Sequence, residues 1–479
     1  MASTVSSAHG PSRTGGSDHA SQRSEVPMSV LEQVKKSPMS RAQIRAVVLC
    51  LGMNLIDGFD LLATSFVSPA ITREWKLSPS QVGFLLSSGL AGMAFGALFL
   101  APLADRIGRR RLTLIGLAVA SLGMLSAAAS QDFGQLIACR LVTGSAVGVM
   151  AASLPVLASE YANSRRRGLA VALITTGYGL GSVIAGIATS LLLNSFGWRS
   201  VLVLGSVATA VLFALGLRFL PESMDYLVAC RPRDALARLN RILTSMGHPQ
   251  VDELPRKELT SRKAAVEALF RGHNARRTVL VWVAFTAAMM AFYFASSWTP
   301  SLLLEAGMSS QQGISGGVLF SLGGVMGAVL LGVSASRVEP RRLTAAYFCA
   351  AALALVLFSV SLGSLAGALV VAVLVGLLLN GSVSGINVIV PTLYPAEARA
   401  TALGIAVAVS RLGAVLAPLL AGFLLQAGWA PGAMFRIFAI PALIGALAMI
   451  LLVRGAQVHR DARGSSVSLE ATGSTATRA

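Results

Sequence analysis

Long apolar segments separated by shorter polar breaks fill most of this chain. We count twelve, each of roughly the length that an α-helix needs to cross a bilayer. A long polar break at residues 221–277 separates the first six from the last six. The pattern predicts an all-α membrane protein with twelve transmembrane helices in two six-helix bundles. The segments span approximately residues 46–71, 82–104, 112–130, 134–158, 168–193, 199–220, 278–300, 314–334, 341–361, 365–388, 402–426 and 432–453.

Basic residues are unevenly distributed among the polar breaks, and their distribution predicts the orientation. They are dense after the even-numbered segments and in the central loop, and sparse after the odd-numbered segments. Because cytoplasmic loops carry the excess of Lys and Arg, both termini are expected in the cytoplasm of a bacterial-type plasma or inner membrane. The central loop is expected to be a tether with a helical stretch at Asp234 to Ile242. The expected division is a disordered tail at 1–42, bundles at 43–220 and 278–454, the loop at 221–277 and a disordered tail at 455–479.

Composition supports a membrane protein and argues against several other classes. Hydrophobic residues make up 54% of the chain and charged residues 13%, about half the charged fraction of an ordinary soluble protein. The net charge of +18 comes largely from arginines between the apolar segments, so it indicates topology, and no nucleic-acid partner is expected. The five histidines lie in the tails and the central loop, and no metal-binding, phosphate-binding or nucleophile motif occurs. We therefore expect no enzyme activity, no metal and no cofactor.

The two halves of the chain repeat a sequence pattern. Residues 96–111 (GALFLAPLADRIGRRR) align without gaps on residues 327–342 (GAVLLGVSASRVEPRR). A parallel repeat of six and six segments is typical of transporters whose site lies between the halves. The lipid bilayer is expected as one partner of the chain, and a monomer is expected.

Two acidic residues lie in the middle of the first apolar segment. Asp57 and Asp60 are three residues apart, so they are about 60° apart around a helix axis, and Asn54 extends the same polar stripe. A charged Asp at the middle of a bilayer costs roughly 2.5–3.5 kcal/mol, and such residues are usually functional. We expect Asp57 or Asp60 to bind and release a coupling proton.

The run ADRIGRRR at 104–111 resembles the cytoplasmic signature of the major facilitator superfamily. The chain departs from that signature at Ala101, where the family usually has Gly, and the second copy has Ser336 in place of Asp105. The resemblance implies a conformational latch in which Asp105 pairs with nearby arginines. The alternative is that the arginines only keep this loop on the cytoplasmic side of the membrane. The gating residues expected on this basis are Asp105, Arg106, Arg109, Arg110, Glu160 and Arg399.

The sequence Asp57-Gly58-Phe59-Asp60 is similar to the DGxD motif of the aromatic acid:proton symporters. Charged residues at Arg140, Glu160, Arg399 and Arg411 agree with that subfamily. The resemblance implies uptake of a small aromatic carboxylate together with a proton.

An arginine inside the membrane stays charged and needs an anion, which either an acid of the protein or the substrate can supply. We expect Arg140 or Arg411 to contact the substrate carboxylate; for Arg140, snorkelling or helix packing is the alternative. For the aromatic residues Tyr293 and Phe294, packing between helices is the alternative. For Asn380 and Asn387, the alternative is a hydrogen bond between helices. The further substrate contacts expected are Asn54, Tyr293, Phe294, Asn380 and Asn387.

The sequence is compatible with other transported molecules as well. A sugar-like, nicotinate-like or dicarboxylate substrate is possible, and so is drug export. Pro221-Glu222-Ser223 resembles the turn of sugar porters, whereas Arg411 favours an anion over a neutral sugar. A transporter-like sensor is disfavoured because the tails are short and featureless.

Overall fold

The computed structural model describes residues 30–254, 262–395 and 397–475, and every secondary-structure element in these ranges is a helix. Eleven of its helices are long and apolar enough to cross a membrane. One of these, α7, contains Gly197 with a φ of 74°, which interrupts the helix and divides it into two spans. The prediction of twelve membrane-spanning helices is therefore confirmed for the described residues.

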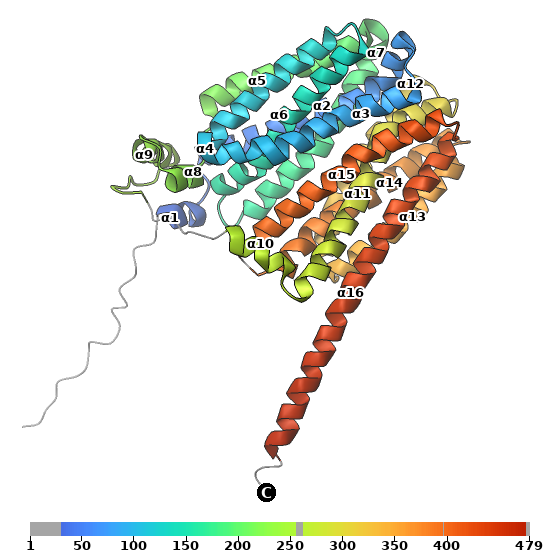
Figure 1. Ribbon diagram of the computed structural model, residues 1–479. Helices are drawn as coiled ribbons and strands as arrows, with labels where there is room; N and C mark the ends of the chain where they lie inside the picture. The colour runs from blue at the N-terminus through green and yellow to red at the C-terminus, as the bar shows by residue number, and fades with distance from the viewer. Residues whose placement is uncertain (1–29, 255–261, 396, 476–479) are drawn as a thin grey trace, which may run out of the picture.

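The two halves lie side by side in Figure 1. The first half contains α2 (Arg41–Trp75), α3 (Pro79–Phe95), α5 (Arg109–Ala128), α6 (Phe133–Tyr161) and α7 (Arg167–Phe219). Between α3 and α5 lie η1 (Gly96–Leu100), η2 (Ala101–Leu103) and α4 (Ala104–Ile107). The second half contains α11 (His273–Glu305), α12 (Ser310–Ser334), α13 (Pro340–Ser361), α14 (Leu365–Leu393), α15 (Arg399–Gln426) and α16 (Pro431–Thr475).

Short helices gather at one end of the bundle, which we call the basic end. They are α1 (Val30–Lys36), α8 (Met224–Cys230), α9 (Ala235–Met246) and α10 (Arg262–Phe270). Buried side chains of α9, such as Leu239 and Leu243, join the same apolar cluster as α2, so the central loop packs on the first half. The helix expected at Asp234 to Ile242 corresponds to α9.

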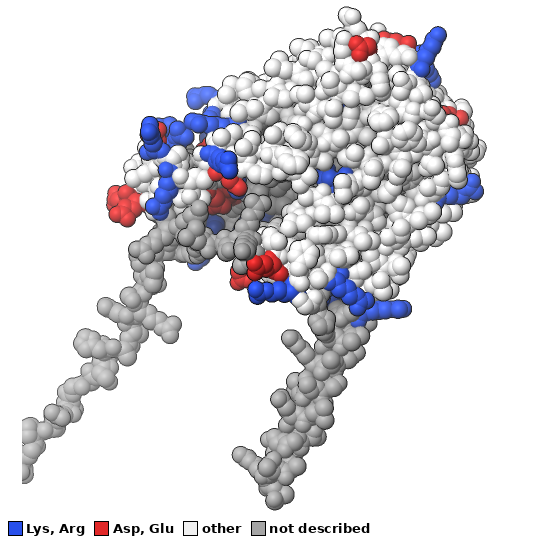
Figure 2. Space-filling model, in the orientation of Figure 1, with Lys and Arg blue, Asp and Glu red and all other residues white. Residues whose placement is uncertain are grey.

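Charged side chains concentrate at the basic end and at the opposite end, and the belt between them is almost entirely uncharged (Figure 2). This belt is the surface expected of a protein that crosses a bilayer. The last helix continues to Thr475, so it includes most of the stretch for which the sequence predicts a disordered tail. Residues 455–475 contain no proline that would interrupt the helix.

The sequence repeat is also visible in how the second helix of each half begins. Ser78 caps α3 and pairs reciprocally with Gln81, and Ser309 caps α12 with Gln312 in the same way. Each capping box satisfies backbone N–H groups that the first helical turn leaves without partners. The two halves therefore start these helices with the same local chemistry.

The first half holds its central acids in place by close contact between α2 and α7. A side chain at Gly58 would overlap the backbone of Tyr178, and one at Gly181 would overlap the backbone of Leu55. Only glycine permits this approach at the two crossing points. The close contact with the backbone of Tyr178 thus explains why residue 58, between Asp57 and Asp60, is a glycine.

Candidate functional site

A cavity of about 240 Å³ lies between the two halves. Its volume equals that of about eight water molecules at roughly 30 Å³ each. Residues from α2, α3, α6 and α7 line one side, and residues from α11, α12, α14 and α15 line the other. The site between the halves that the sequence repeat predicts is therefore present as a cavity.

Arg411 of α15 brings a positive charge to the cavity wall. Its Nη1 lies 3.3 Å from the hydroxyl oxygen of Tyr293 and 3.2 Å from the sulfur of Met93, which belongs to the other half. Its Nε is buried and has no hydrogen-bond partner among the described residues. A guanidinium with a spare donor inside a cavity is suited to binding a carboxylate.

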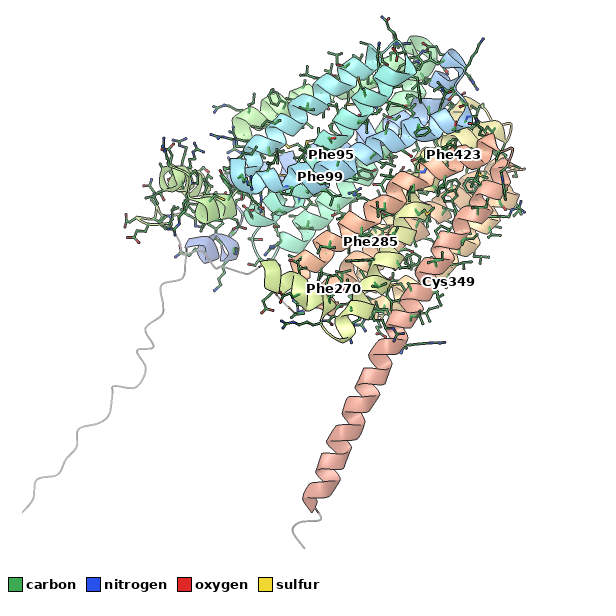
Figure 3. All side chains as sticks on the ribbon, in the orientation of Figure 1. Phe95, Phe99, Phe270, Phe285, Cys349 and Phe423 are labelled. Carbon is green, nitrogen blue, oxygen red and sulfur yellow. The ribbon has the colours of Figure 1, made fainter. Side chains whose placement is uncertain are left out.

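One face of α11 supplies an aromatic wall. Phe285, Met289, Phe292 and Tyr293 line the cavity at the spacing of a single helical face, and Figure 3 labels Phe285 on this helix. The ring of Phe292 also lies 5.7 Å from that of Phe320 on α12.

Phe294, which the sequence predicts to contact substrate, does not line the cavity in this structure. Phe294 is fully buried and stacks on Phe438 of α16, with ring centroids 3.9 Å apart. It follows Tyr293 by one residue, and this step of about 100° around the helix turns it away from the cavity. Phe292, which lies on the cavity face, is the aromatic residue that takes its place.

Polar side chains face the cavity from three further helices. Asn54, Asn380 and Asn387 all line it. Asn380 also donates a hydrogen bond of 2.8 Å to the carbonyl oxygen of Gly324, so it joins α14 to α12 while facing the cavity. Tyr178 of α7, which the sequence analysis does not single out, lines the cavity too, and its hydroxyl has no partner in the described residues. The sequence feature that could have identified Tyr178 is its polar hydroxyl group within an apolar segment, between Gly177 and Gly179.

Asp60 and Arg140 form a buried ion pair inside the first half. Arg140 Nη1 donates to Asp60 Oδ1 at 2.9 Å and to the hydroxyl of Thr64 at 2.8 Å. Asp60 is 1% exposed and Arg140 2% exposed, and neither lines the cavity. Arg140, which the sequence predicts as a substrate contact, therefore lies outside the cavity in this conformation, and its charge is compensated by Asp60.

Asp57 is buried to the same extent but has a different environment. It is 1% exposed, and neither carboxylate oxygen has a hydrogen-bond partner among the described residues. Asn54, one turn earlier on α2, lines the cavity, and its buried side-chain oxygen also has no partner there. A buried carboxylate without partners is costly when charged, so this geometry accommodates the protonated form.

Contacts between the halves seal the end opposite the basic end. Ser68 and Ser301 hydroxyls are 3.3 Å apart, and Ser87 donates to the carbonyl of Val415 at 2.8 Å. The rings of Phe84 and Phe423, the latter labelled in Figure 3, meet edge to face with centroids 5.8 Å apart.

Nearer the middle, the hydroxyls of Ser182 and Ser321 are 2.7 Å apart. In the described residues, the hydrogen bonds that join the halves lie from this level outward, and none lies at the basic end. The helices of the two halves also separate toward α8 and α10 in Figure 1. The cavity is therefore closed from the opposite end in this conformation.

A polar cluster at the basic end joins α5, α6 and α8. Glu160 forms an ion pair with Arg109, and the hydroxyl of Ser223 donates to both carboxylate oxygens of Glu160, at 3.0 and 2.8 Å. Arg110 donates to the carbonyl oxygens of Leu217 and Leu220. All of these residues belong to the first half and the loop that packs on it, so the cluster does not cross between the halves.

The other expected gating residues are arranged differently from the prediction. Asp105 is exposed and takes part in no ion pair with the residues that the structure describes; its carbonyl oxygen accepts a hydrogen bond from Cys230. Within the described part of the chain, this conformation therefore does not pair Asp105 with an arginine, and Glu160 pairs with Arg109. Arg106 is exposed, and its carbonyl accepts from Tyr226. Arg399 donates to the carbonyl of Tyr394 within the second half.

The described residues contain no group of three His, Cys, Asp or Glu side chains placed to hold a metal ion.

Comparisons with known proteins agree with this architecture. Residues 49–406 match the family model described as the Major Facilitator Superfamily. The chain is 31% identical to the 4-hydroxybenzoate transporter PcaK of Acinetobacter baylyi, an alignment that covers 93% of this chain and 98% of that protein. It is also 31% identical to the gallate transporter of Pseudomonas putida, with 89% and 95% covered.

Among solved structures, the xylose transporter XylE of E. coli, in a partially occluded inward open conformation, has a similar fold. The TM-score is 0.65 and the sequence identity is 15%, with 86% of this chain and 99% of that chain covered.

Proposed function

The chain belongs to the major facilitator superfamily, and we propose that it imports a small aromatic carboxylate together with a proton. Arg411 carries this proposal. It places a guanidinium with a free donor among the rings of Phe285, Phe292 and Tyr293, in a cavity that suits a molecule with a single ring. The ring of such an acid would stack on the aromatic wall while its carboxylate contacts Arg411.

The similar proteins support the same substrate class. The names of the relatives include transporters of 4-hydroxybenzoate, gallate and 3-(3-hydroxy-phenyl)propionate, all of them aromatic acids. A neutral sugar would leave the charge of Arg411 without an anion, and the likeness to the xylose transporter extends to the fold alone. We therefore favour an aromatic acid over a sugar.

The structure gives the two acids of α2 different surroundings, and we assign them different roles. Asp60 is paired with Arg140, and we assign it the role of fixing the position of that guanidinium. Asp57 has no partner in the described residues, so its charge is not compensated by any other group. Asp57 is then the proton carrier. It releases its proton when water or a cation reaches it, because either one stabilises the charged carboxylate.

The proposed cycle requires the two halves to rock about the central cavity. With the basic end in the cytoplasm, as the charge distribution predicts, the described conformation faces inward because the opposite end is sealed. The cluster of Glu160, Arg109 and Ser223 would then act as a gate that gains contacts with the second half when the basic end closes.

Uptake of radiolabelled 4-hydroxybenzoate into cells, with and without a protonophore, tests this proposal. We expect the protonophore to prevent accumulation, and Asp57→Asn to abolish accumulation while exchange of internal for external acid continues. Accumulation that ignores the protonophore, or full accumulation by Asp57→Asn, would remove the proton role. Absence of uptake for every aromatic acid tried would remove the substrate class.

A further inference from the structure

A second pocket, distinct from the central cavity, opens at the basic end of the first half. It has a volume of about 710 Å³ and lies between the start of α5, the end of α7 and the loop helix α9. Its charged lining is strongly unbalanced, with five arginines and one acid: Arg110, Arg111, Arg218, Arg238, Arg241 and Glu222. The proposed transport cycle does not use this pocket.

Several of these charges are not compensated within the described structure. The side chains of Arg111 and Arg241 make no hydrogen bond or ion pair with any residue that the structure describes. Arg218 lies 5.8 Å from the ring of Phe219, and Arg238 is 3.8 Å from the carboxylate of Asp234 on its own helix.

The single acid of the lining is already engaged. Glu222 Oε1 accepts hydrogen bonds from the backbone N–H groups of Arg110 and Ser223, at 2.9 and 3.0 Å. The side chain of Arg110 is bound to carbonyl oxygens at the end of α7. The pocket therefore presents at least three cationic side chains, Arg111, Arg218 and Arg241, to a ligand from outside the chain.

A row of exposed apolar side chains on α7 leads to the pocket. On α7, Val207, Val211 and Leu215 are exposed at spacings of four residues, and Arg218 follows on the same helical face. This apolar stripe belongs to the belt that contacts lipid, and it ends at an arginine of the pocket.

The neighbouring helix has the same arrangement. On α5, the exposed Leu122 and Ile115 lie on one face with Arg111 at the basic end. Phe219 and Ile242 add apolar surface to the wall of the pocket itself. Two lipid-facing stripes thus lead into one cluster of arginines.

We propose that this pocket binds the phosphate-bearing headgroup of an anionic phospholipid from the leaflet that meets the basic end. The phosphate contacts Arg111, Arg218 and Arg241, and the acyl chains lie along the exposed stripes of α5 and α7. A soluble anion would contact the arginines alone, whereas a phospholipid can contact the arginines and, at the same time, the two lipid-facing stripes that end beside them. The bound lipid joins α9 of the central loop to the end of α7.

Binding of lipid to the purified full-length protein in detergent tests this inference. The probe is dioleoyl phosphatidylglycerol, measured by native mass spectrometry, and phosphatidylcholine and soluble glycerol phosphate are compared with it. We expect Arg218→Gln/Arg241→Gln to bind phosphatidylglycerol about 30-fold more weakly, the factor that two basic side chains supply at an anionic surface. The control Arg165→Gln/Arg166→Gln removes the same charge from an exposed loop at the same end and should bind like the wild type.

Equal binding by the pocket variant and the control would overturn the proposal. Binding of glycerol phosphate as strong as that of the lipid would also overturn it, because the site would then take soluble anions. If the pocket variant does not fold, a photo-reactive phosphatidylglycerol added to the wild-type protein decides the matter. Cross-links in the peptides that contain Phe219 or Ile242 support the site, and cross-links confined to other peptides refute it.

Discussion

The Asp60–Arg140 ion pair gives the sharpest test of the energetics inside the first half. Replacing Asp60 by Asn keeps the volume of the side chain but removes its charge, which leaves the guanidinium of Arg140 buried without a counter-ion. Breaking a buried pair in this way costs about 3–5 kcal/mol. Because the amide oxygen of Asn can still accept a hydrogen bond, we expect a loss near the lower limit, about 3 kcal/mol.

A matched control exists near the opposite end of the same half. Arg199 Nη1 lies 2.8 Å from Glu74 Oε1, close to the 2.9 Å of the buried pair, but its side chain is 41% exposed and that of Glu74 is 42% exposed. Exposed pairs contribute at most about 1 kcal/mol, so Arg199→Gln should have a small effect. The two variants therefore compare the same interaction at two depths of burial.

Equilibrium unfolding of the purified protein in mixed micelles titrated with dodecyl sulfate, followed by tryptophan fluorescence, measures both changes. The double variant Asp60→Leu/Arg140→Met removes both charges, and it should recover most of the stability that Asp60→Asn loses. Equal losses for Asp60→Asn and Arg199→Gln would refute the reasoning. A double variant as unstable as the single one would refute it as well, since the cost would not come from the stranded charge.

Three further predictions follow from the cavity and its seal. Arg411→Lys keeps the charge but loses the planar fork, so the KM for uptake of the aromatic acid should rise about 10- to 100-fold; an unchanged KM would separate Arg411 from the substrate. Phe294→Ala should destabilise the protein by about 3–5 kcal/mol without changing KM, whereas Phe292→Ala should raise KM; the reverse pattern would contradict the two placements. Gly83→Val forces apart α3 and α15, because a Cβ at Gly83 would lie 3.2 Å from the Cα of Gly422; a cysteine placed beside this contact should then react several-fold faster with an impermeant thiol reagent, and an unchanged rate would show that the contact is not the seal.

The spans could be predicted from the sequence because a segment that crosses lipid must pair its backbone polar groups within a helix and be predominantly apolar. Length and hydropathy therefore located the twelve helices, including the two that Gly197 separates within α7. The similarity of residues 96–111 to residues 327–342 likewise predicted a site between two similar bundles, and the cavity lies between them.

Details of the site depended on the rotation and contacts of single helices, which no local pattern contains. Asp57 and Asp60 are equivalent in the sequence, yet only Asp60 meets Arg140 from α6. Phe294 was indistinguishable from Tyr293 until the packing of α16 was known. The pair of Arg109 and Glu160 joins α5 to α6, and Ser223 at the start of α8 donates to the same carboxylate, so these contacts connect segments far apart in the chain.

Serine hydroxyls, glycine backbones, aromatic edges and a few contacts of glutamine and arginine side chains form the seam between the halves, whereas the buried ion pair Asp60–Arg140 lies wholly within one half. Hydrogen bonds between membrane helices average about 0.6 kcal/mol each, so the few that span the seam can break by thermal motion. A rocking movement would leave the strong internal pair untouched and exchange only weak contacts. The molecule thus combines durable halves with an easily reversible junction, which favours rapid turnover over a long-lived closed form.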